Sequence, residues 1–419
     1  MVPPSMIERL RPAPGTYGYA GAIVAAQMMA QVGGFALPAL LPTYMTRWNL
    51  TATEAGWLVG VFFAAYVAMV PILLSLTDRV PARRIYLLGT GLTTLAHLGF
   101  ALLADGFWSA MLFRILAGAG WAGTYMTGLR IISDPLEGTA QSRAVSWHAA
   151  GVGVSNAASF AVAGVVAALA GADAAFLIGG AASATAFAIA LIIVREAPRR
   201  AEKPSRRLLD YRPVFRNRPA LAWIAGYTVH TWEMAVVRGW AVTFFAVVIA
   251  WHGSPAWLPD PTVLFTLAGL AGVLVSISGN ESAQRWGRSR IVLVAMSTAA
   301  ALSLVAGWTA AISTPLAVIV IVLWNAAIYL DSSALTAGTV GAADKEHRGA
   351  TMGLHSMCGY AGGFVGPPLA GLLLDLVGRD TVAGWGFAFG HLALITLSGL
   401  AIMRYFNPAA APRVVIRPA

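Results

Sequence analysis

Three ionisable side chains lie in one otherwise apolar stretch of the sequence, AGYTVHTWEMAVVRGWAVTFF, and they are His230, Glu233 and Arg238. His230 and Glu233 are three residues apart, so they share one face of a regular helix. Burial and a nearby cation shift the pKa of a carboxyl group in opposite directions, so a buried glutamate can titrate within the physiological range. The pattern predicts reversible proton binding by Glu233, tuned by His230 or Arg238, with Asp331 as the next candidate. The alternative is that Glu233 and Arg238 tie neighbouring helices together.

A second set of polar and aromatic side chains has the chemistry to bind a solute. Gln27 and Gln31 are four residues apart and share a helix face. Arg114 offers bidentate hydrogen bonds that suit an anionic group, and the alternative is that it braces two helices. The predicted substrate-binding residues are Gln27, Gln31, Arg114, Trp121, Tyr125, Trp232, Arg238, Asn325 and Tyr329. Each polar member, taken alone, is as often a contact that holds helices together.

The elements that position these residues must cross a membrane. Of the 419 residues, 58% are hydrophobic and 11% are charged, and the mean hydropathy is +0.70. A soluble domain carries about 25% charged residues, so this composition excludes a water-soluble globule. A membrane helix needs about 20 mostly apolar residues. Twelve spans are predicted on that basis, at 18–42, 54–76, 84–104, 107–132, 143–169, 173–194, 219–249, 262–280, 290–312, 314–339, 348–377 and 382–405.

The predicted spans divide six and six around a polar linker. Residues 195–218 contain nine basic and three acidic side chains. Basic residues collect in the cytoplasmic loops of membrane proteins, so the linker and both termini are predicted to be cytoplasmic. The expected domains are an N-terminal six-helix bundle at 1–194, the linker at 195–218 and a C-terminal six-helix bundle at 219–419. The net charge of +10 follows this loop pattern, which argues against a nucleic-acid partner.

The two halves of the chain carry similar short motifs about 205 residues apart. Arg143 opens the fifth predicted span in the sequence RAVS, and Arg348 opens the eleventh in the sequence RGAT. The loop after the second span contains Asp78 and Arg79, followed by the basic pair at 83–84. Parallel repeats of six spans are a transporter architecture.

These motifs resemble those of the major facilitator superfamily, and the resemblance covers nearly the whole chain. The family's loop signature, G-x-x-x-D-R-x-G-R-R, is matched at Asp78 and Arg79 but not at its two glycines. Its fourth-span signature, R-x-x-x-G-x-G, is matched by Arg114, Gly118 and Gly120. The resemblance implies an all-α membrane protein of twelve transmembrane helices in two pseudo-symmetric six-helix bundles, with spans 1, 4, 7 and 10 lining a central cavity. The residues that we assign to a gate are Asp78, Arg79, Arg130, Arg143 and Arg348.

The sequence therefore favours a secondary active transporter that moves a small organic solute by alternating access and is coupled to protons. Three intramembrane arginines favour an organic anion. One alternative is a proton-driven efflux pump for drugs or other amphipaths, favoured by the aromatic side chains and by Glu233 and Asp331. Another is a membrane assembly factor that uses the same scaffold without transport.

An enzyme is not expected, because no nucleophile motif, metal cluster or phosphate-binding G-x-x-x-x-G-K-[ST] motif occurs. We expect no cofactor and no metal. The expected partners are a small-molecule substrate, protons and the lipid bilayer. The expected state is a multi-pass monomer in the inner (cytoplasmic) membrane.

Overall fold

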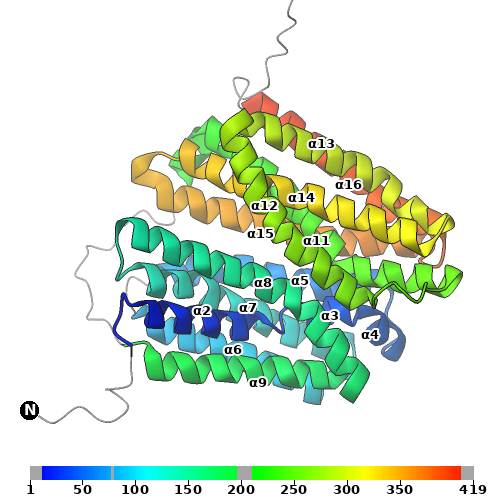
Figure 1. Ribbon diagram of the computed structural model, residues 1–419, viewed down its shortest axis with the longest axis horizontal. Helices are drawn as coiled ribbons and strands as arrows, with labels where there is room; N and C mark the ends of the chain where they lie inside the picture. Colours follow the sequence, from blue (N-terminus) through cyan, green and yellow to red (C-terminus); the bar gives the residue numbers. More distant parts are fainter. Residues whose placement is uncertain (1–11, 77–79, 196–209, 407–419) are drawn as a thin grey trace, which may run out of the picture. The chain divides into compact units, whose positions relative to one another are not determined.

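The computed structural model describes residues 12–76, 80–195 and 210–406, and every regular element in these ranges is a helix (Figure 1). The all-α fold class is therefore confirmed. The first half of the chain contributes α2 (Tyr17–Gln31), α3 (Ala36–Ala39), α4 (Leu41–Arg47), α5 (Ala52–Leu76), α6 (Ala82–Leu103), α7 (Phe107–Ser133), α8 (Gly138–Ala170) and α9 (Ala172–Ile193). The second half contributes α10 (Arg212–Arg216), α11 (Arg218–His252), α12 (Pro261–Trp286), α13 (Arg288–Ala306), η1 (Gly307–Ala311), α14 (Thr314–Ala342), η2 (Lys345–His347), α15 (Arg348–Val377) and α16 (Val382–Phe406).

Each of the twelve predicted spans corresponds to helical structure. Ten helices in the described part of the chain are long and apolar enough to cross a membrane. The other two spans are α7, which carries Arg114 and Arg130, and the first span, which is broken into α2, α3 and α4. The break falls at a turn that contains Gly33 and Gly34, because glycine is among the weakest helix formers.

The described residues form two compact units. Unit 1 comprises those within 1–50, 57–206 and 260–270, and unit 2 comprises those within 51–56, 207–259 and 271–419. Each unit thus includes the first residues of one helix from the other half of the sequence, α12 in unit 1 and α5 in unit 2. The bundle boundaries at 1–194 and 219–419 stay a prediction.

In unit 1, small residues allow neighbouring helices to approach closely. α6 packs against α7 and α9, and α2 packs against α8 and α9 (Figure 1). A Cβ atom added at Gly89 of α6 would lie 2.7 Å from the backbone carbon of Gly123 of α7. A Cβ atom added at Gly118 would overlap the backbone carbonyl oxygen of Phe62 in α5. Close packing of this kind drives helix association in membranes, and it gives Gly118 of the fourth-span motif a structural role.

Replacing Gly118 with alanine is expected to lower the midpoint of thermal unfolding of the purified protein. The added methyl group must push α7 away from the α5 backbone, and overpacking of this kind costs about 1–3 kcal/mol. Gly21→Ala on α2 is the matched control, because no atom lies within 4 Å of its added Cβ. Its midpoint is expected not to fall, since alanine favours a helix by about 1 kcal/mol over glycine. Equal midpoints for Gly118→Ala and the unchanged protein would show that the close approach of α7 to α5 at Gly118 does not contribute to stability.

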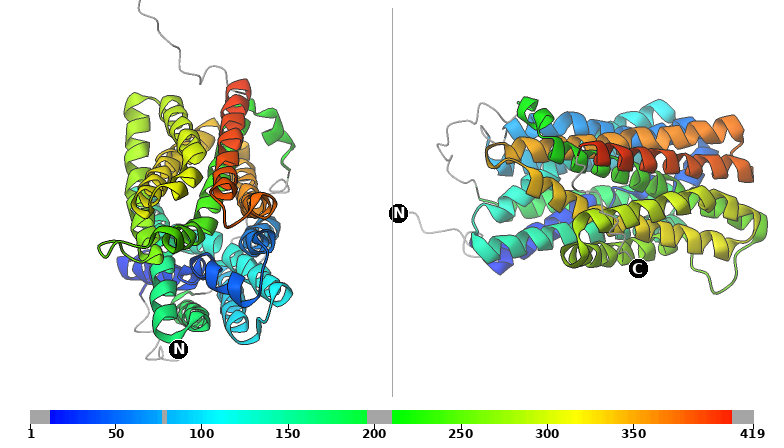
Figure 2. Two further views of the ribbon diagram at one scale, coloured as in Figure 1. Left: turned by 90° about the vertical axis from the view of Figure 1, so that its right-hand side faces the viewer. Right: turned by 90° about the horizontal axis from the view of Figure 1, so that it is seen from above.

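In unit 2, α11 is the central helix. It packs against α14, α15 and α16, which run beside it (Figure 2). Of its 35 residues, 20 are buried. A helix that is buried on most of its circumference lies in the interior of its bundle. The polar side chains of α11 therefore lie inside unit 2.

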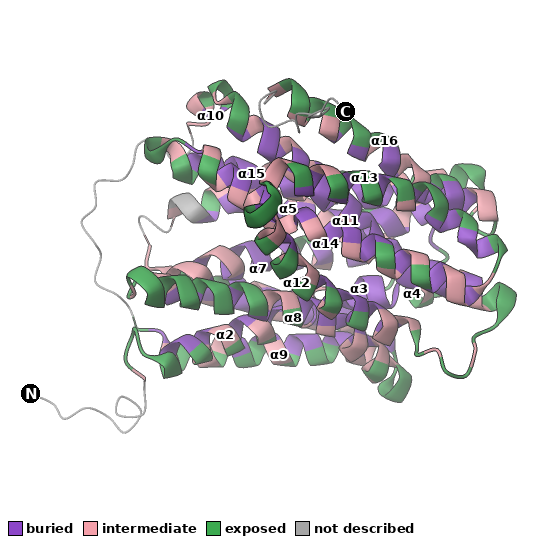
Figure 3. Ribbon diagram, turned by 45° about the horizontal axis from the view of Figure 1, so that its top comes forward, coloured by how far each residue is buried: buried purple, intermediate pink, exposed green. Residues whose placement is uncertain are grey.

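Large apolar side chains are exposed along the outer helices, as the green faces of α9, α13 and α16 show (Figure 3). Leu95 of α6, Ile178 of α9, Val294 of α13 and Leu394 of α16 are 63%, 46%, 50% and 73% exposed. These helices are spans 3, 6, 9 and 12, none of which is among the four spans that the family resemblance places around the central cavity. Continuous apolar faces of this kind suit acyl chains and not water.

Candidate functional site

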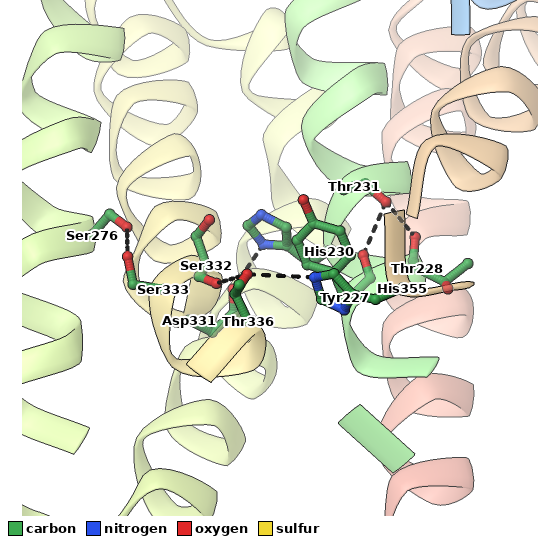
Figure 4. A network of polar contacts seen from close by, with 10 residues as sticks. All are labelled: Tyr227, Thr228, His230, Thr231, Ser276, Asp331, Ser332, Ser333, Thr336 and His355. Carbon is green, nitrogen blue, oxygen red and sulfur yellow. Dashed lines mark hydrogen bonds and ion pairs between the residues drawn. The ribbon is translucent and has the colours of Figure 1, made fainter. Parts of the chain in front are cut away.

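His230 of α11 and Asp331 of α14 form an ion pair in the interior of unit 2 (Figure 4). His230 Nδ1 lies 2.7 Å from Asp331 Oδ1, and their side chains are 1% and 4% exposed. A buried pair of this type can hold its shared proton on the imidazole ring or on the carboxyl group. The structure thus brings together two of the three predicted proton-coupling residues.

Glu233, the third of these residues, lies on α11 one turn beyond His230. It is 2% exposed, and its Oε1 atom has no hydrogen-bond partner within the described part of the chain. The polar side chains that face its carboxyl group are Thr396 of α16 and Trp324 of α14, and Asp331 is near enough to repel it when both are charged. An isolated buried carboxylate costs far more than the neutral acid. Protonation of Glu233 therefore changes the energy of this region strongly.

A layer of hydroxyl and ring groups adjoins the ion pair (Figure 4). His355 of α15 is buried, and its Nδ1 and Nε2 atoms lie 3.1 Å from Thr339 Oγ1 and 3.5 Å from Thr336 Oγ1. The Tyr227 ring stacks on the His355 ring at a centroid distance of 3.8 Å and lies 5.7 Å from the His230 ring. The spacing of residues along α11 and α15 does not indicate that these rings meet, so the sequence alone does not place His355 in this layer.

The remaining substrate-binding candidates of unit 2 are only partly grouped. The Arg238 guanidinium donates a hydrogen bond to the Tyr329 hydroxyl and lies 5.6 Å from the centre of its ring. Asn325 is buried on the same helix as Tyr329. Trp232 is half-buried on α11, and its indole nitrogen has no hydrogen-bond partner in the described residues. The structure therefore joins Arg238 to Tyr329, a contact that links α11 to α14.

Arg114 of α7 lies buried in unit 1 at 3% exposure. Its Nε atom donates to the Leu58 carbonyl oxygen at 3.1 Å, and Nη1 donates to the Gly34 carbonyl oxygen at 3.5 Å. The guanidinium carbon lies 4.7 Å from the centre of the Phe62 ring. A guanidinium has five N–H donors, and within the described ranges no carboxylate lies in ion-pair distance of it. Arg114 is thus a buried cation with donors to spare.

A cavity of about 10 Å³ lies next to these groups in unit 1 and is lined in part by Gln31, His97 and Trp121. A volume of this size holds about one water molecule. The amide nitrogen and oxygen of both Gln27 and Gln31 are buried without hydrogen-bond partners in the described part of the chain. The His97 Nδ1 atom lies 2.8 Å from the Thr93 carbonyl oxygen, and its Nε2 atom is buried with no hydrogen-bond partner among the described residues.

The aromatic candidates of unit 1 separate into two groups. The Trp121 ring lies 4.7 Å from the Phe62 ring and 6.0 Å from the Phe35 ring. Tyr125 is half-buried one turn further along α7, where its ring lies 5.6 Å from the ring of His148. Trp121 therefore shares the neighbourhood of Arg114, whereas Tyr125 lies on the side of His148.

The gate residues stay a prediction. Asp78 and Arg79 lie outside the described residues. Arg130 pairs with Asp134 at 3.2 Å, four residues along the chain, and both side chains are partly exposed. Arg143 and Arg348 are exposed near the starts of α8 and α15.

The sequence profile described as "Major Facilitator Superfamily" matches residues 23–330 and 260–418. The chain belongs to this superfamily. It is a multi-pass membrane transporter and not an enzyme. No curated protein matches the chain at a significant level.

Solved structures of other family members share the fold. A bacterial homologue of the human lysosomal transporter Spinster, in an inward-facing and unoccupied conformation, has a TM-score of 0.75 and 16% identity, with 95% of this chain and 97% of that chain covered. The nucleoside transporter NupG has a TM-score of 0.72 and 13% identity, covering 92% and 99%. A POT family transporter in complex with a thioalcohol-conjugated peptide has a TM-score of 0.75 and 14% identity, covering 97% and 100%. These likenesses establish the fold alone.

Proposed function

We propose that the protein is a secondary active transporter that couples the movement of a small organic solute to protons by alternating access. The observation that carries this proposal is the buried set of Glu233, Asp331 and His230 in unit 2. Ionisable groups inside a membrane protein are costly and mark ion or proton pathways. We further propose that it acts as a monomer in the inner membrane with both termini in the cytoplasm, since the basic residues of the sequence favour that orientation.

Coupling follows from what one proton does to the buried set. When Glu233 is charged, it faces the charged Asp331 across an apolar interior, and the two carboxylates repel each other. A proton on Glu233 removes this repulsion and gives the carboxyl group an O–H donor. An equilibrium between a conformation that exposes Glu233 and one that buries it therefore depends on its protonation. The proton shifts the populations of the two conformations because it binds them with different affinity.

For the substrate we propose an organic anion. Arg114 supports this choice, because it is a buried guanidinium with unused donors and no carboxylate partner in the described ranges. Guanidinium groups bind carboxylates and phosphates through two parallel hydrogen bonds. The unpartnered amides of Gln27 and Gln31 supply further donors and acceptors in the same unit.

A proton-driven pump for amphipathic drugs is the second candidate. The observations in its favour are the two buried carboxyl groups of unit 2, Glu233 and Asp331, and the half-buried indole of Trp232 on the same helix as Glu233. Carboxylates and aromatic rings attract lipophilic cations. We do not propose the non-transporting assembly factor, because a static scaffold has no use for buried groups that titrate.

Transport by the reconstituted protein is expected to depend on a pH gradient. The measurement is flux of radiolabelled organic anions, and separately of a lipophilic phosphonium cation, into proteoliposomes with a gradient imposed in either direction. For one proton per solute, each pH unit supports about tenfold accumulation, because one unit is worth about 1.4 kcal/mol. A protonophore, which collapses the pH gradient, is expected to abolish this accumulation. Accumulation of the cation alone would favour the efflux pump, and flux indifferent to the gradient for every probe would refute proton coupling.

A further inference from the structure

The helices of unit 2 that carry the buried titratable groups share one end, which we call the linker end, formed by residues 218, 342 and 348. The Asn217 side-chain amide donates to the carbonyl oxygen of Ala342 at 2.8 Å, which joins the start of α11 to the end of α14. A cluster that contains Ile224 of α11 and Leu354 of α15 joins the start of α11 to the start of α15. The loop between α14 and α15 at this end is exposed at residues 344–346.

The polar side chains of unit 2 form a series that runs inward from the linker end. At 1.5 Å of rise per residue, Thr339 lies about 5 Å along α14 from Ala342, and His355 lies about 10 Å along α15 from Arg348. By the same count, Asp331 lies about 17 Å along α14, and Glu233 lies about 22 Å along α11 from Arg218. Thr339 and His355 therefore lie between the exposed loop and the ion pair.

His355 has the contacts of a proton carrier. It is 3% exposed, and each ring nitrogen faces a hydroxyl group of α14, Thr339 at Nδ1 and Thr336 at Nε2. Hydroxyl and imidazole groups both donate and accept hydrogen bonds, so they can pass a proton along a chain. The titratable groups that face His355 are Tyr227 and His230 of α11. In the described residues, α14 presents only the two threonine hydroxyls to its ring nitrogens.

We propose that His355 relays protons between the linker end and the Asp331–His230 pair. This inference rests on the proposed proton coupling of that pair. A proton reaches Nδ1 from the buried Thr339 hydroxyl, which takes up another proton through water from the exposed loop at 344–346, and the proton on Nε2 leaves through the Thr336 hydroxyl. The ring is neutral before and after, in the opposite tautomer, and it resets by rotation or by transfer in the other direction. Thr336 and Asp331 are five residues apart on α14 and make no direct hydrogen bond within the described residues, so we propose that the last transfer passes through water.

The test follows protonation of the Asp331 and Glu233 carboxyls in the full chain in lipid nanodiscs after an alkaline-to-acid pH jump. The probe is the infrared C=O stretching band of each protonated carboxyl, assigned by its loss in Asp331→Asn or in Glu233→Gln. His355→Phe keeps a ring for Tyr227 to stack on but removes both nitrogens. This variant is expected to slow the rise of each band by at least about tenfold. The equilibrium titration curve of each carboxyl is expected to stay in place, and added imidazole is expected to restore the rate.

His391→Phe is the matched control, because His391 is a half-buried histidine of the same unit whose Nδ1 atom bonds the carbonyl oxygen of Ala388 in its own helix. It is expected to leave the rate unchanged. An unchanged rate in His355→Phe, or a rate that changes only as the equilibrium curve does, would overturn the relay. If His355→Phe does not fold, His355→Asn gives the same comparison. Absence of any titrating carboxyl band in the unchanged protein would instead refute the proton-coupling role of Glu233.

Discussion

Glu233→Gln is expected to abolish accumulation of the solute against its gradient while leaving exchange of the solute across the membrane. Glutamine has nearly the volume of glutamic acid, and its amide can donate a hydrogen bond to the Thr396 hydroxyl and accept one from the Trp324 indole N–H. It cannot bind or release a proton at neutral pH. The variant therefore resembles a permanently protonated carrier, which can move the solute but has lost the proton-dependent change in energy.

The expected effect is large and can be measured in proteoliposomes. Under a gradient of one pH unit, the accumulation ratio of the unchanged protein approaches about ten for one proton per solute. In Glu233→Gln it is expected to fall to one, whereas counterflow of labelled solute persists. Glu281→Gln is the matched control, because Glu281 is an exposed glutamate of unit 2. Accumulation by Glu233→Gln at the original ratio would contradict the coupling role, and loss of counterflow as well would assign Glu233 to solute binding or folding.

The order of the helices could be predicted because membrane spans depend on composition over about 20 residues, and the sequence contains that information locally. The break in the first span was not predicted, although Gly33 and Gly34 lie where it occurs. An apolar run that contains two glycines reads as a continuous span in a hydropathy count. Whether the chain turns there depends on the contacts made by its neighbours, such as the approach of Gly33 to His97 and Gly179.

The site could be predicted only as far as single helices allow. The pairing of His230 with Asp331 and of Arg238 with Tyr329 joins residues about 100 positions apart. Sequence periodicity says which residues share a helix face, but it does not say which faces of two helices meet. Glu233 was expected to be tuned by a cation, whereas the charged group that most affects it is the carboxylate of Asp331. For the same reason, the role of His355 was visible only after α14 and α15 were placed in one unit.

Arg114 offers the second large expected effect. Arg114→Gln is expected to weaken binding of the organic anion by at least about 30-fold, because removing one partner of a buried, hydrogen-bonded charge pair costs about 2 kcal/mol or more. Arg114→Lys keeps the charge but not the planar fork of donors, so it is expected to recover only part of the affinity. The measurement is the dissociation constant of the radiolabelled anion that the flux assay identifies, with the protein in detergent. Arg47→Gln is the matched control, since Arg47 is an exposed arginine of unit 1 that pairs with Asp173.

A brace between helices would also weaken binding when it is lost, so the comparison must separate the two roles. The Arg114 guanidinium bonds the backbone of α5 at Leu58 and the backbone at Gly34, and losing these bonds would affect every ligand alike. An analogue of the solute with an amide in place of its carboxylate has the same shape without the charge. If Arg114 binds the anion, Arg114→Gln lowers affinity for the carboxylate much more than for the amide, because a double-mutant cycle isolates the pairwise contact. Equal losses of affinity for the two ligands would assign Arg114 to the packing of unit 1. Recognition of the substrate's charge would then have to come from other residues.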